Sequence, residues 1–153
     1  MLYILYNPDG SIHQANRVYD PEPVGQQSYD ELLNEKEEAF VKIENAPALL
    51  PPDKFYVDVA AKEVVKRPIM PITVSATVIK AGDEKNGAIF RNIPKGVTYA
   101  IYGPYDALIY PVPGTSNLFP ATELDLSIPM PCTYRVEFEL WPYQKFSINI
   151  EAV

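Results

Sequence analysis

The sequence predicts a mainly β protein, in which a small N-terminal α+β domain precedes an immunoglobulin-like β-sandwich. Short runs alternate between apolar or aromatic residues and polar or small ones, as in 73–79, 97–102, 134–140 and 146–150. Turn residues separate these runs at short intervals, which is typical of strands with one face on a core and one on water. The same stretch carries no helix signal of useful length, so its strands are expected to form a sandwich.

The N-terminal part is expected to begin with a hairpin of strands 2–7 and 11–18. The turn between them, 7–10, reads Asn-Pro-Asp-Gly, where proline presets φ and glycine accepts a positive φ. After a loop over 20–27, Ser28 and Glu31 match a capping box, which predicts a helix through about Glu38. The expected inner face of that helix is formed by Tyr29, Leu32, Leu33 and Lys36.

A strand over 39–43, a loop over 45–53 and a hairpin of strands 55–59 and 63–67 complete the expected domain 1–67. Residues 68–71 contain two prolines, which stiffen a linker and interrupt a strand. The second domain is therefore expected over 72–153. Its strand candidates are 72–80, 88–93, 97–103, 107–111, 117–119, 123–128, 133–141 and 145–152. Trp141, the only tryptophan, is expected to fill the core of this domain.

Composition and charge narrow the function classes. The net charge of −7 argues against a nucleic-acid-binding surface, which needs clustered Lys and Arg. The chain shows no apolar stretch long enough to span a membrane and no secretory leader, so membrane insertion is not expected. Cys132 is the only cysteine, which excludes an intramolecular disulfide and suggests folding in a reducing cytoplasm.

Catalytic and metal-binding constellations are not expected, so the chain is interpreted as a non-enzyme without a cofactor. His13 is the only histidine, and it lies far in sequence from Cys132. Glu137 and Glu139 alternate with apolar residues, which favours the solvent face of one strand over a pair of catalytic carboxylates. The loop 82–87 could offer carboxylates to calcium, but it lacks the repeated Asp-x-Asp spacing and is more typical of a solvated hairpin tip.

Aromatic residues are the candidates for binding. The chain has 11 tyrosines and 16 prolines, residue types that supply contact area at low ordering cost. The aromatic residues between 99 and 119 could stack on sugars or fill a pocket of a partner. The edge of the N-terminal hairpin is a second expected contact. The candidate partner-binding residues are Tyr3, Tyr6, Tyr102, Tyr105, Tyr110 and Phe119.

Three stretches carry a resemblance to a known class of proteins. They are the opening hairpin 2–10, the segment 56–68, and the close formed by 132–136 with Trp141-Pro142-Tyr143. In these stretches the chain resembles small virion proteins encoded among the tail genes of tailed phages and prophages. The chain departs from that pattern at Pro131-Cys132, where Pro-Gly is commoner.

The resemblance implies a tail-associated structural protein, made in the host bacterial cytoplasm and incorporated in the virion. It implies partners among tail fibre or tail tip components, in several copies, and it supplies no catalytic residues. Two alternatives stay open. The chain could be a carbohydrate- or host-surface-binding module of the tail, or a tail fibre assembly factor that is absent from the mature particle.

Overall fold

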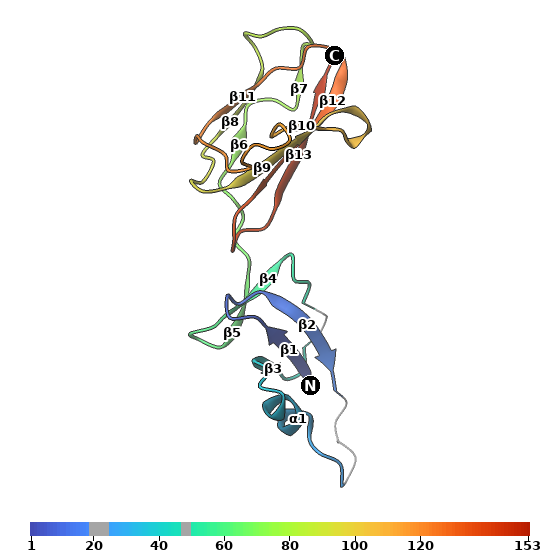
Figure 1. Ribbon diagram of the computed structural model, residues 1–153, viewed down its shortest axis with the longest axis vertical. Helices are drawn as coiled ribbons and strands as arrows, with labels where there is room; N and C mark the ends of the chain where they lie inside the picture. Colours follow the sequence, from blue (N-terminus) through green and yellow to red (C-terminus); the bar gives the residue numbers. More distant parts are fainter. Residues whose placement is uncertain (19–24, 47–49) are drawn as a thin grey trace. The chain divides into compact units, whose positions relative to one another are not determined.

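The computed structural model describes residues 1–18, 25–46 and 50–153 (Figure 1). The described chain is mainly β, as predicted, with thirteen strands, one α-helix and one short 3-10 helix. It divides into two compact units, Met1–Arg67 and Pro68–Val153, referred to below as unit 1 and unit 2. The loops expected over 20–27 and 45–53 lie partly outside the described residues. None of the described helices is long and apolar enough to cross a membrane.

Unit 1 contains an antiparallel sheet in the order β2-β1-β3 and an antiparallel hairpin of β4 and β5. The strand bounds are β1 Leu2–Tyr6, β2 Ile12–Arg17, β3 Phe40–Ile43, β4 Phe55–Asp58 and β5 Glu63–Lys66. The helix α1 spans Tyr29–Glu35, and the predicted capping box is confirmed. The Ser28 side chain accepts a hydrogen bond from the Glu31 amide, and Glu31 in turn accepts one from the Ser28 amide.

The strand β1 is buried along its whole length. Tyr3 and Leu5 pack with Leu33 of α1 on one face of the sheet. Leu2, Ile4 and Tyr6 pack on the other face, in a cluster that includes Val57 of β4. The helix and the β4–β5 hairpin therefore cover opposite faces of this strand. Of the expected inner face of α1, Leu33 is buried, whereas Lys36 is exposed.

A polar cluster fastens α1 to the sheet. The Tyr3 hydroxyl donates a hydrogen bond to the Asp30 carboxylate, which also pairs with the Lys42 ammonium. The ring of Tyr29 meets the ring of Tyr3 edge to face at 4.7 Å. Burial, together with the bond to Asp30, raises the pKa of Tyr3. The helix has only seven residues, so these contacts are needed to hold it.

Unit 2 contains a five-stranded sheet in the order β10-β9-β12-β13-β7 and a three-stranded sheet in the order β11-β8-β6 (Figure 1). The strand bounds are β6 Thr73–Val74, β7 Val78–Ile79, β8 Ala88–Arg91, β9 Thr98–Tyr102, β10 Leu108–Tyr110, β11 Leu124–Leu126, β12 Cys132–Glu139 and β13 Phe146–Ala152. All neighbouring strands are antiparallel except β7 and β13, which run parallel.

Two expected strands differ in the structure. The run 72–80 is divided, because β6 pairs with β8 of the smaller sheet and β7 pairs with β13 of the larger one. Ser75 marks the crossing, where its amide donates to the Ile89 carbonyl and its hydroxyl accepts from the Ile89 amide. The expected strand 117–119 is reduced to a single bridge between Thr98 and Leu118.

The two sheets of unit 2 share one hydrophobic core. Phe138 of β12 is fully buried, with Phe90, Phe119 and Phe146 around it at centroid distances of 6.2, 5.5 and 6.1 Å. The prediction that Trp141 fills this core is wrong, since 40% of this residue is exposed. Trp141 lies beyond the end of β12, in the turn to β13. The interior between the two sheets is filled by the phenylalanines instead.

Candidate functional site

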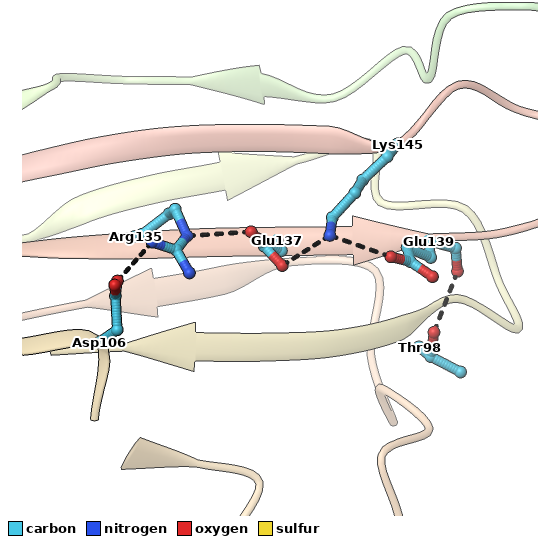
Figure 2. Close-up of polar contacts among 6 residues, drawn as sticks. All are labelled: Thr98, Asp106, Arg135, Glu137, Glu139 and Lys145. Atoms are coloured by element: carbon cyan, nitrogen blue, oxygen red, sulfur yellow. Dashed lines mark hydrogen bonds and ion pairs between the residues drawn. The ribbon is translucent and has the colours of Figure 1, made fainter. Parts of the chain in front are cut away.

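The outer face of the five-stranded sheet carries a row of alternating charges (Figure 2). Val136 and Phe138 of β12 point into the core. Arg135, Glu137 and Glu139 alternate with them on the opposite face. In this row Arg135 pairs with Asp106 at 2.6 Å and with Glu137 at 2.9 Å. Lys145 pairs with Glu137 at 2.9 Å and with Glu139 at 3.1 Å. These residues, Asp106, Arg135, Glu137, Lys145 and Glu139, form the charge ladder.

Glu137 is the centre of the charge ladder, and only 14% of its side chain is exposed. Partial burial raises the pKa of Glu137, but hydrogen bonds and charge attraction from Lys145 and Arg135 outweigh it, and the pKa is lowered. The hydrogen bond to Asp106, and then that to Glu137, raises the pKa of Arg135 against the effect of desolvation. The bonds to Glu137 and Glu139 raise the pKa of Lys145 in the same way. Each charge of the ladder therefore has an opposite charge as neighbour, which favours a structural role over proton transfer.

The charge ladder also holds the turn that follows β9. The Arg135 guanidinium lies 4.5 Å from the centre of the Tyr102 ring and bonds to Asp106, so the sheet and the turn are joined. The Gly103 amide donates to the Ala107 carbonyl at 2.8 Å. Tyr105 and Asp106 have φ values of 61° and 55°, which are uncommon for residues other than glycine. This turn holds the Tyr105 side chain fully in solvent.

Exposed apolar side chains gather on the same segment. Five of the eleven large hydrophobic residues that are exposed in the described chain lie between positions 105 and 118. We define them as the apolar strip: Tyr105, Leu108, Tyr110, Val112 and Leu118. The strip includes β10, which is an edge strand because β9 is its only neighbour among the described strands. Beside it, a hollow of about 190 Å³ is lined by polar groups that include Asn117, Glu137 and Lys145.

The structure separates the predicted binding residues into three groups. Tyr105 and Tyr110 are exposed on the apolar strip. Tyr102 is half-buried under Arg135, and Phe119 packs on Tyr99 and Phe138 in the core. The placement of Tyr3 and Tyr6 at an exposed hairpin edge is wrong, because only 3% and 8% of them are exposed. Their strand is central in its sheet rather than at its edge.

Sequence reasoning missed Leu108, Val112 and Leu118, which belong to the apolar strip. A signal was present, because these apolar residues lie in a segment rich in proline and glycine, where a continuous core-facing pattern cannot be maintained. All three are aliphatic, whereas the predicted contact residues are all aromatic.

The histidine, the cysteine and the carboxylate loop that were considered as reactive groups lie in separate places. His13 lies 3.7 Å from Glu38 on the surface of unit 1, and Cys132 is half-buried in unit 2. In the loop 82–87, the Asp83 carboxylate accepts hydrogen bonds from the amides of Lys85 and Asn86. Within residues 1–18, 25–46 and 50–153, no group of three or more His, Cys, Asp or Glu residues is placed to hold a metal ion.

The charge ladder leads to a prediction about acid stability. Glu137→Gln should lower the free energy of unfolding at neutral pH by about 1–2 kcal/mol, because charge-assisted hydrogen bonds to two cations are weakened. The folded pKa of Glu137 lies below its ordinary value of 4.5, so folding favours the ionised form. This stabilisation is complete above the unfolded pKa and is lost as the pH falls through the folded pKa.

Urea titrations of both proteins across the acidic range measure the effect. The difference between Glu137→Gln and the unmodified chain should shrink as the pH falls below 4.5. Glu151→Gln, an exposed carboxylate on the neighbouring strand β13, is the control and should change stability by less than about 0.5 kcal/mol. Equal effects of the two substitutions at neutral pH would contradict a stabilising role of the ladder.

In comparisons with known proteins, no family model, no curated protein and no solved structure matches this chain.

Proposed function

We propose that unit 2 is an immunoglobulin-like β-sandwich and that unit 1 is a small α+β domain. The strand order supports the first assignment. An immunoglobulin fold has strands A, B and E adjacent in one sheet and C, F and G adjacent in the other. The orders β6-β8-β11 and β9-β12-β13 follow the same pattern, and their cores meet in one cluster. The covering of one sheet by α1 supports the second assignment.

We further propose that the chain is a non-enzymatic structural protein of a phage tail, which joins or decorates tail fibre or tail tip components. The resemblance of 2–10, 56–68 and the Trp141-Pro142-Tyr143 close supplies the context. The observation that carries a contact function is the apolar strip. Contiguous apolar patches on a protein surface mark interaction sites, and this segment holds five of the eleven exposed large hydrophobic residues of the described chain.

The geometry of the strip favours a rigid contact. Tyr105 projects from a turn that Asp106 and Arg135 hold in place, so little backbone freedom is lost on binding. Tyrosine is also enriched among the residues that contribute most to binding energy. The charge of Asp106 is neutralised by Arg135, so the strip favours an uncharged surface of the partner. A permanent contact in the particle should bury more than about 1,000 Å² in total.

A double substitution tests this function. Tyr105→Ala with Leu108→Ser should weaken binding to purified tails by roughly thirtyfold or more, as expected when a main contact residue is removed. Met130→Ser, at another exposed apolar site of unit 2, is the control and should bind as the unmodified chain does. Binding is measured by titration of labelled protein against tails, and the copy number by mass spectrometry of purified particles.

The other outcomes separate the alternatives. A chain that binds nascent fibres but is absent from purified particles would indicate an assembly factor. A chain that binds host glycans through Tyr105 and the polar hollow beside the strip, with no affinity for tails, would indicate a host-surface module. Absence from particles together with no affinity for any tail component would contradict the structural function.

A further inference from the structure

We propose that Asn86 and Gly87 form a site of spontaneous covalent modification, at which the Asn86 side chain deamidates. The two residues end the loop between β7 and β8. Asn86 is exposed, so water and hydroxide reach it freely. Gly87 has no side chain, so nothing on the following residue shields the nitrogen that reacts.

The reaction needs only this chain and water. The Gly87 backbone nitrogen loses its proton to solvent base and attacks Cγ of Asn86, which forms a carbon–nitrogen bond and closes a succinimide ring. The bond from Cγ to Nδ2 breaks, and Nδ2 leaves as ammonia with a proton from water. A water molecule then opens the ring at either carbonyl, which yields aspartate or isoaspartate at this position. No oxidant or reductant takes part.

The reacting groups are adjacent in the chain, and the Asn86 side chain lies at the surface. Nδ2 of Asn86 donates a hydrogen bond of 2.9 Å to the Asp83 carboxylate, which holds the side chain on the surface of the loop. The Asn86 amide donates to the same carboxylate at 3.3 Å. Among the described residues, no acceptor is found for the Gly87 amide. Its nitrogen can therefore react without loss of a hydrogen bond, and proximity makes the attack intramolecular.

The product should disturb the start of β8. A new carboxylate at position 86 replaces a donor of the hydrogen bond to Asp83, so attraction becomes repulsion between like charges. Isoaspartate also lengthens the main chain by one carbon directly before Gly87. The backbone at Gly87 packs closely against β11, because a Cβ built on Gly87 would lie 2.4 Å from the Leu126 carbonyl oxygen.

Mass spectrometry of the intact purified chain after prolonged incubation tests the proposal. Incubation in water labelled with heavy oxygen, at mildly alkaline pH, marks the product formed before digestion. Asn117 is the internal control, because it is also exposed but precedes Leu118. Asn86 should convert at least about tenfold faster than Asn117, which corresponds to a barrier lower by about 1.4 kcal/mol. The rate should rise with pH, because the deprotonated amide attacks.

Two variants complete the test. Asn86→Gln should abolish the fast conversion of this peptide, because the longer side chain would have to close a larger ring. Asn86→Asp should show the lower melting temperature that is expected of the aged protein. Conversion of Asn86 no faster than that of Asn117, or heavy-oxygen uptake in the Asn86→Gln peptide at the rate of the unmodified chain, would overturn the proposal.

Discussion

Phe138→Ala is expected to lower the free energy of unfolding of unit 2 by about 3–5 kcal/mol, which is a large part of the stability of an ordinary domain. Phe138 is fully buried, and its ring lies among three other phenylalanine rings. Truncation removes the transfer energy of the ring and leaves a cavity between the two sheets. Urea unfolding, combined with amide hydrogen exchange of β9, β12 and β13, measures the loss.

The matched control is Trp141→Ala in the same β12–β13 region. Trp141 is the larger side chain, but it is 40% exposed, so its truncation should cost clearly less than that of Phe138. Comparing the two variants separates the effect of side-chain size on stability from the effect of burial. If Trp141→Ala destabilises unit 2 as strongly as Phe138→Ala does, the tryptophan contributes as much to the core as Phe138, and the assignment of Phe138 as the main core residue is wrong.

Gly10→Ala is expected to destabilise unit 1 by about 2–4 kcal/mol, from backbone strain and a lost hydrogen bond. Gly10 ends the turn between β1 and β2 with a φ of +87°. A Cβ at this position would lie 2.2 Å from the Val57 carbonyl oxygen. The Gly10 carbonyl also accepts a hydrogen bond of 2.8 Å from the Val57 amide, so β4 would have to move away.

Gly25→Ala isolates the backbone part of this effect. Gly25 has almost the same φ, +86°, but a Cβ there would meet nothing within 4 Å. Its substitution should therefore cost only about 1–2 kcal/mol. Amide hydrogen exchange of β1 and β4 measures the loss of stability in both variants. Equal losses for Gly10→Ala and Gly25→Ala would show that the contact between the turn and β4 contributes little.

Local signals predicted the secondary structure well. The strands of the opening hairpin, the capping box at Ser28 and the long hairpin of β12 and β13 lie within a few residues of their expected positions. These elements depend on alternation, turn residues and caps, which act over short distances in the chain. The chain divides into two compact units after Arg67, directly before the proline-containing segment 68–71.

The candidate site was predicted only in part, because exposure depends on neighbours that are distant in sequence. Tyr105 and Tyr110 were identified from composition, and they are exposed. Tyr3 and Tyr6 lie in the unbroken apolar run Leu2–Tyr6, and α1 and the β4–β5 hairpin cover both faces of this strand. Such a run is typical of a strand with two covered faces, but it does not say which elements cover them.

The sequence by itself determined where most strands, the turns and the helix lie, since backbone preferences and hydrophobic period are properties of neighbouring residues. The tertiary structure decided which strand is central, which is at an edge, and which aromatic ring fills the core. Strand pairing made β10 an edge and left its apolar side chains in water. Phe138, and not Trp141, is buried between the sheets, because only a residue that lies between both sheets can be enclosed by them.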